Sequence, residues 1–116
     1  MRVKSAMAAV AVAASVSFAA VLPGTPALAA SCPDNGWSIA DGRIGRFFNG
    51  NGINIRTGPS TRCTAVGQGQ ASHDVQLDCF KDGDGGTWSH LFDFTTSKEG
   101  WVRDDLLVGR GAVVRC

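Results

Sequence analysis

Asn54 and Arg56 are the first side chains whose types and spacing could bind a ligand. They alternate with Ile53 and Ile55, so in an extended strand they project away from the face that those apolar residues bury. The planar guanidinium of Arg56 suits a carboxylate ligand. The alternative, which we favour for polar groups on a surface strand, is that both side chains brace the following turn. Arg56 would then bond loop carbonyls and Asn54 would bond the backbone.

Trp88, His90 and Phe92 form a second candidate set, because their alternation puts them on one face of a strand. If Leu91 points into the core, this face is open to solvent or to a groove, where Trp and Phe could stack on a sugar or a peptide. The alternative is that the face is covered by the preceding N-terminal arm, through the aromatic residues Trp37, Phe47 and Phe48. The sequence leaves both possibilities open.

The titratable residues do not form a recognisable catalytic or metal centre. His73 and His90 are the only side chains expected to titrate near neutral pH. No Ser/His/Asp set, G-x-S-x-G motif, C-x-x-C pair or H-x-x-H pair accompanies them. The Asp-Gly-Asp-Gly run that starts at Asp82 has Gly86 where a calcium loop needs a third oxygen ligand. We therefore expect no enzyme activity, no metal and no cofactor.

Residues 1–29 are predicted to be a cleaved signal peptide. Arg2 and Lys4 form a basic head, an apolar run extends from Ala6 to Val21, and small residues precede the expected cleavage site after Ala29. The run is shorter than the ~20 residues that a membrane span needs. We therefore expect a secreted protein, extracellular or associated with the cell wall, with no membrane contact after cleavage.

The remaining chain is small, nearly neutral and rich in cysteine. It carries nine basic and ten acidic side chains, a net charge of −1, which gives no basic surface for nucleic acid. Its four cysteines are expected to form two disulfides, as in other small exported domains. They are Cys32, Cys63, Cys79 and Cys116. Sequence alone allows three pairings.

Short strands separated by glycine-rich turns dominate the predicted secondary structure. No segment after the signal peptide has a sustained helical period. Five strands are expected at residues 53–56, 63–68, 73–80, 87–94 and 101–103, with 43–48 and 113–114 as candidates for a further short strand and one helical turn at 104–107. This pattern predicts an all-β fold, a small barrel or sandwich of five or six short antiparallel strands.

One disulfide pairing is favoured by a predicted hairpin. If strands 63–68 and 73–80 pair around a turn near Ala71, Cys63 lies opposite Cys79. Opposed residues have Cβ atoms ~4.5–5.5 Å apart, which is close to disulfide geometry. This register favours a Cys63–Cys79 disulfide, and leaves Cys32–Cys116 to join the two ends.

The segment Gly52–Thr61, GINIRTGPST, resembles the signature of bacterial SH3-like (SH3b) domains, whose first strand typically reads L-N-V-R-S-G-P-S-T. Further segments resemble the family's later strands in the same order. They are Thr64–Gly67, Val75–Leu77, Trp88–Leu91 and Gly100–Val102. The resemblance divides the chain into an N-terminal arm at 30–51, an SH3-like domain at 52–107 and a C-terminal tail at 108–116, tied back by a disulfide.

The resemblance implies a partly open barrel that acts as a binding module. SH3b domains commonly attach to peptidoglycan or its cross-bridge peptides, and the cysteines and loops resemble the small secreted SH3-like proteins of actinobacteria. We therefore expect a non-catalytic monomer that binds peptidoglycan or an extracellular peptide through Asn54, Arg56, Trp88, His90 and Phe92. The alternative is a secreted interaction or inhibitor module that acts on an extracellular enzyme, for which rigid loops such as Lys81–Gly86 are suited.

Overall fold

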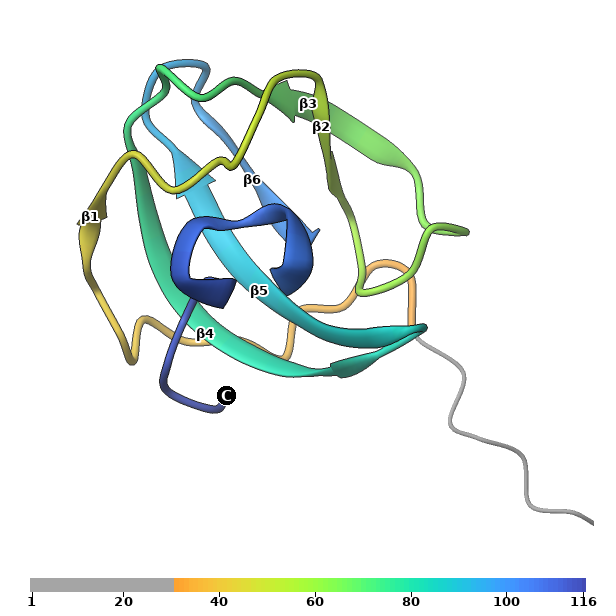
Figure 1. The fold of residues 1–116 in the computed structure, drawn as a ribbon. Coiled ribbons are helices and arrows are strands. Elements are labelled where there is room, and N and C mark those ends of the chain that lie inside the picture. The colour runs from red at the N-terminus through yellow and green to blue at the C-terminus, as the bar shows by residue number, and fades with distance from the viewer. Residues whose placement is uncertain (1–30) are drawn as a thin grey trace, which may run out of the picture.

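The computed structural model describes residues 31–116, so the predicted signal peptide lies outside the described residues. Six strands and two short 3-10 helices make up the fold (Figure 1). They are β1 (Ile44–Gly45), β2 (Ile53–Arg56), β3 (Ala65–Gly69), β4 (Val75–Gly83), β5 (Gly86–Asp93), β6 (Lys98–Arg103), η1 (Asp104–Leu106) and η2 (Val108–Arg110). Within residues 31–116, no helix is long and apolar enough to cross a membrane.

All six strands belong to one open antiparallel sheet with the order β1-β4-β5-β6-β2-β3. The three longest strands, β4, β5 and β6, form two consecutive hairpins near the centre of the sheet. β1 and β3 are its edge strands (Figure 1). Two disulfides cross-link the chain. The predicted all-β class of short antiparallel strands is therefore confirmed.

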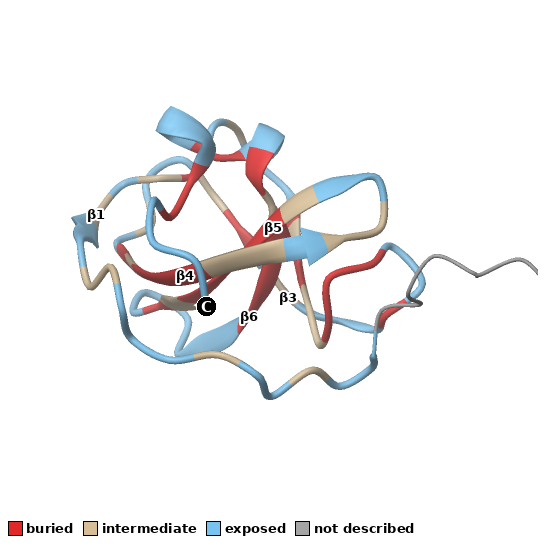
Figure 2. Cartoon of the chain, turned by 90° about the horizontal axis from the view of Figure 1, so that it is seen from below, coloured by how far each residue is buried: buried red, intermediate tan, exposed pale blue. Residues whose placement is uncertain are grey.

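The inner face of the sheet carries the hydrophobic core. Alternation along the strands turns Ile55, Leu77 and Leu91 inward, and none of these three side chains is exposed. The remaining members of the core come from β2, β4, β6 and the segments around them: Phe48, Ile53, Val75, Val102, Leu107 and Ala112. Figure 2 shows buried residues concentrated along the central strands.

The outer face of β5 and β6 is covered by the N-terminal arm. Ala40 N and Asp41 N both donate to the Asp78 carbonyl, and Gly42 N donates to Leu77, so the arm follows β4. Trp37 stacks on His90 with ring centroids 3.8 Å apart. Of the three aromatic residues expected to cover this face, Trp37 contacts His90, whereas Phe48 lies in the core and Phe47 packs against that core.

The predicted hairpin between residues 63–68 and 73–80 is wrong. β3 pairs with β2 in a register that joins Ile53 to Gly69, whereas β4 pairs with β5 and β1. The turn after β2 is the physical reason: Thr57 N donates to Thr64 O and folds β3 straight back onto β2. β3 and β4 are therefore separated by three strands in the sheet order.

The disulfide pairing that depended on this hairpin is also wrong. The bonds are Cys32–Cys63 and Cys79–Cys116, in place of the predicted Cys63–Cys79 and Cys32–Cys116. Cys63 faces the N-terminal arm because it lies in the β2–β3 turn. The C-terminal tail is held along β4, where Phe80 N donates to Val114 O and Cys116 N donates to Phe80 O. The tail is thus tied back as expected, but to β4.

Candidate functional site

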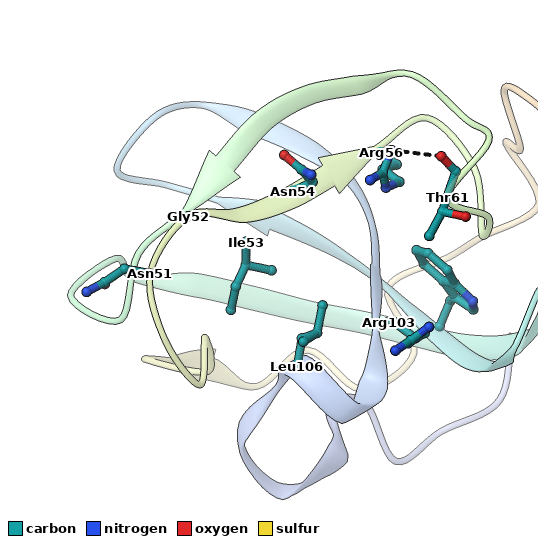
Figure 3. A pocket seen from close by; sticks show the side chains of 9 residues that line it. Asn51, Gly52, Ile53, Asn54, Arg56, Thr61, Arg103 and Leu106 are labelled. Atoms are coloured by element: carbon teal, nitrogen blue, oxygen red, sulfur yellow. Dashed lines mark hydrogen bonds between the residues drawn. The ribbon is translucent and has the colours of Figure 1, made fainter.

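A pocket of about 370 Å³ opens beside β2, between this strand and η1. Three of the five predicted ligand-binding residues line it: Asn54, Arg56 and Trp88 (Figure 3). The other lining residues are Asn51, Gly52, Ile53, Thr61, Arg103 and Leu106. The pocket therefore joins the two candidate sets that the sequence places more than thirty residues apart, from Arg56 to Trp88.

Arg56 is held by the turn that follows β2. Its Nη1 donates to the carbonyls of Thr61 at 3.1 Å and Cys63 at 3.0 Å, so it does brace its own loop. Its Nε–H and Nη2 groups have no protein partner in the described part of the chain, and neither has its charge an acidic partner there. Arg56 thus fits both the turn-bracing and the ligand-binding interpretation. The bonds of Nη1 to the turn hold the guanidinium in place, and its other N–H groups remain free to bind a ligand.

Asn54 lies beside Arg56 on the same side of β2, but it does not bond the backbone. Its Oδ1 accepts a long bond of 3.4 Å from Gln68 Nε2 on the neighbouring strand β3. Asn54 is half-buried, and its amide N–H groups donate to no other described residue. A weak side-chain contact of this length leaves the amide free to bond a ligand.

Trp88 forms a wall of the pocket. Only 2% of this residue is exposed, and its Nε1 donates to the Asp84 carbonyl at 2.9 Å. Its β5 position pairs with Arg103 of β6, which brings a second guanidinium to the site. The indole is therefore fixed in orientation where it lines the pocket.

Arg103 is paired with Asp105, two residues further along the chain, at the protein surface. Its Nε and Nη2 donate to the two carboxylate oxygens of Asp105 at 2.9 and 3.0 Å. These bonds raise the pKa of Arg103 and lower the pKa of Asp105. Of the two cations at the pocket, Arg56 is thus the one whose charge has no acidic partner among residues 31–116.

Ile53 and Leu106 supply the apolar part of the site and point toward each other across it (Figure 3). Ile53 is 8% exposed and Leu106 is 41% exposed. Neither Leu106 nor Arg103 was predicted to bind a ligand. Their place depends on the β5–β6 register and on the path of η1, and the sequence offers no local pattern that marks them.

His90 and Phe92 lie outside this pocket. His90 is 2% exposed, lies under Trp37, and has its Nδ1 at 2.7 Å from Asp78 Oδ2. Phe92 packs edge-on against Phe94, with ring centroids 5.0 Å apart. The aromatic groove expected from the alternation is therefore divided, with Trp88 in one pocket and His90 under the arm.

The fold and the pocket together define a disulfide-linked all-β domain with an open pocket that is lined by two arginines. Two disulfides indicate an oxidising, extracellular environment. No group of three or more His, Cys, Asp or Glu that could hold a metal occurs among the described residues. No protein-family model, curated protein or solved structure matches the chain. The resemblance to SH3-like domains therefore depends only on the GINIRTGPST motif and the segments that follow it.

Proposed function

We propose that the protein is a secreted, non-catalytic SH3-like module that binds peptidoglycan or an extracellular peptide at the Arg56 pocket. One observation carries the proposal: Arg56 has one edge fixed by the Thr61 and Cys63 carbonyls, and its remaining donors have no protein partner among residues 31–116. A guanidinium held in this way is suited to a carboxylate. The ligand group is therefore a free carboxylate on a peptide, at its C-terminus or on an acidic side chain.

The rest of the pocket suits a peptide. The Asn54 amide can bond peptide N–H and C=O groups, and Ile53 and Leu106 can pack on a small apolar side chain. Because the loop carbonyls hold Arg56 beforehand, little side-chain entropy is lost when the carboxylate binds. A bond between charged groups in such a half-buried site contributes roughly 1.5–3 kcal/mol.

A matched pair of ligands tests the carboxylate directly. Acetyl-trialanine with a free C-terminus and its C-terminal amide would each be titrated against the oxidised protein, with binding followed at the Asn54 and Gln68 side-chain amides by NMR. We expect the free acid to bind about tenfold more tightly than the amide. Equal affinity for the two peptides would exclude Arg56 as a carboxylate receptor.

Substitutions test whether Arg56 is the residue that binds the carboxylate. A pulldown with cell wall tests whether peptidoglycan is the biological ligand. Arg56→Lys keeps the positive charge but loses the planar guanidinium, which can donate two parallel hydrogen bonds to a carboxylate. It should weaken binding of the free-acid peptide about tenfold. Arg62→Ala, in the same loop with its side chain 68% exposed, serves as the control. In a pulldown with purified cell wall at low salt, oxidised protein that stays wholly in the supernatant would rule out peptidoglycan.

An inhibitor or interaction module is the second candidate, and the β4–β5 turn favours it. Asp84 N donates to Pro59 O, and its Oδ2 accepts bonds from Ser60 Oγ at 2.6 Å and Arg62 Nη2 at 2.9 Å. The bonds from Ser60 and then Arg62 hold the pKa of Asp84 below its usual value. A turn fixed in this way needs little ordering when it docks on an enzyme.

Co-purification from culture supernatant separates the two candidates. A module that acts on an enzyme should be recovered with a stoichiometric protein partner, and Asp84→Ala should release that partner by loosening the turn. Arg56→Lys should leave such a partner bound. Recovery of the protein with cell-wall fragments alone would favour the Arg56 pocket instead.

A further inference from the structure

A second pocket, of about 130 Å³, lies under the N-terminal arm and shares no lining residue with the Arg56 pocket. Its walls come from the arm, the end of β2, and the outer sides of β3, β5 and β6. The residues that matter here are Asp34, Trp37, His90, Glu99 and Trp101. The chemistry of this pocket differs from that of the Arg56 pocket, since no Lys or Arg lines it.

Three aromatic rings line this pocket, those of Trp37, His90 and Trp101. Trp37 is parallel to His90 at a centroid distance of 3.8 Å, and Trp101 meets the same His90 edge-on at 5.3 Å. The molecule already places a cation on these rings, because Lys81 Nζ lies 5.1 Å from the centroid of Trp101. Indole faces attract ammonium groups through their quadrupole.

His90 lines this pocket, and one of its two ring nitrogens has no hydrogen-bond partner among residues 31–116. Its Nδ1 lies 2.7 Å from Asp78 Oδ2, a hydrogen bond that uses this nitrogen. In the tautomer with its proton on Nδ1, His90 offers Nε2 as an acceptor, and no group within residues 31–116 donates to it. An acceptor on a residue that is only 2% exposed, lining a cavity, calls for a donor from the occupant.

The charge at the pocket is negative. The Asp34 carboxylate is already neutralised by Lys81 Nζ, with N–O distances of 3.1 and 3.2 Å. Glu99 lies on the surface at the rim and forms no ion pair with any described residue. The occupant should therefore combine a positive charge, which Glu99 attracts, with an N–H group, which His90 requires.

We propose that this second pocket binds a primary ammonium group, either a lysine-type side chain or a free amino terminus. The ammonium would donate to His90 Nε2 and to the Glu99 carboxylate, with its stem against Trp37. A quaternary ammonium lacks the N–H that the His90 acceptor needs. This site is independent of the Arg56 pocket and selects the opposite charge.

The test compares a cation with its neutral counterpart on the whole oxidised domain. n-Butylammonium and n-butanol would be titrated at pH 7.5 and followed by NMR at the Trp37 and Trp101 indole N–H signals. We expect n-butylammonium to bind about tenfold more tightly than n-butanol, and tetramethylammonium to bind more weakly than n-butylammonium. Equal affinity for n-butylammonium and n-butanol would overturn the proposal.

Variants and two further ligands complete the test. Glu99→Gln should weaken n-butylammonium binding about three- to tenfold, whereas Asp82→Asn, whose side chain is 79% exposed elsewhere, should not change it. Nα-acetyl-lysine methylamide and alanine methylamide distinguish a side-chain amine from an amino terminus. Unchanged n-butylammonium binding in Glu99→Gln would overturn the proposal. Arg56→Lys should leave n-butylammonium affinity unaltered, so that a failure of this proposal can be told apart from a failure of the proposed Arg56 pocket.

Discussion

The indole of Trp37 lies parallel to the imidazole of His90, with centroids 3.8 Å apart and planes inclined by 10°. Trp37 belongs to the N-terminal arm and His90 to β5, so this stack fastens the arm to the outer face of the sheet. The arm is anchored on both sides of Trp37, by the Cys32–Cys63 disulfide and by the bonds of Ala40 and Asp41 to Asp78. The stack thus holds the middle of the N-terminal arm against the sheet, between two points where the arm is already attached.

Trp37→Ala should lower the free energy of unfolding by about 2–3 kcal/mol, because it removes a stacked ring and uncovers His90. Urea unfolding of the oxidised protein measures the change. Ile39→Ala is the control, since Ile39 lies two residues further along the arm and is 62% exposed; its effect should stay within about 0.5 kcal/mol. Similar losses in both variants would show that the stack contributes nothing specific.

Asp78→Asn should destabilise the fold by about 1–3 kcal/mol. Asp78 accepts a bond from His90 Nδ1 at Oδ2 and a bond from Gln76 Nε2 at Oδ1. The asparagine side chain of the variant has only one oxygen, so it can keep only one of these two bonds. The His90 and Asp78 side chains are 3% and 2% exposed, so water cannot replace the lost acceptor. Asp74→Asn, at a side chain 59% exposed, should cost under about 1 kcal/mol in the same urea experiment.

The Asp41 carboxylate should make the free energy of unfolding depend on pH in the acid range. Hydrogen bonds from the Arg43 guanidinium lower the pKa of Asp41 from 3.8 to about 2, with further bonds from the backbone N–H groups of Val113 and Arg43. A folded pKa below the unfolded value adds stability above about pH 4, and this stability is lost as the pH falls from about 4 to 2. The difference in unfolding free energy between wild type and Asp41→Asn should therefore shrink over that range.

Denaturant unfolding at pH 5, 4, 3 and 2 measures this difference, because contributions shared by both proteins cancel. Asp82→Asn is the matched control, since the only ion pair that Asp82 forms within residues 31–116 is a 3.4 Å contact with Arg115 at an exposed site. A pH-independent difference for Asp41→Asn would mean that Arg43 does not hold the Asp41 carboxylate in solution.

Non-reducing peptide mapping should find Cys32 joined to Cys63 and Cys79 joined to Cys116. Trypsin alone leaves Cys63 and Cys79 on the one fragment 63–81, so a second protease must cut before Asp74 and Asp78. A bond internal to 63–81 would instead support the hairpin expected from sequence. Replacing both Cys79 and Cys116 by Ala should cost roughly 2–4 kcal/mol, because the unfolded chain regains the freedom of a closed loop.

Alternation along each strand was enough to predict most of the sheet. The predicted strand at 53–56 has the bounds of β2, and the segments at 73–80, 87–94 and 101–103 overlap β4, β5 and β6. Leu91 points into the core and His90 away from it, as a period of two requires. These features depend on local patterns, and each strand carries its own pattern.

Strand partners and the path of the arm could not be predicted in the same way. β3 has turn residues on both sides, and the Thr57–Thr64 bond decides that it joins β2 and not β4. The disulfide error followed from that one choice. For the pocket, Asn54, Arg56 and Trp88 were proposed from their types and alternation, but their position beside Arg103 depends on the register between distant strands.

The order of the two disulfides makes the covalent structure two consecutive rings, 32–63 and 79–116, joined by residues 64–78. A protease that cuts the exposed turn at Ala71–Ser72 would release two ring-closed fragments with no bond between them. Crosswise pairing of Cys32 with Cys116 would have kept such fragments linked. The chain is therefore suited to fragment complementation: two pre-locked halves, one with β2 and one with β6, could be made separately and would regenerate the Arg56 pocket only on reassembly.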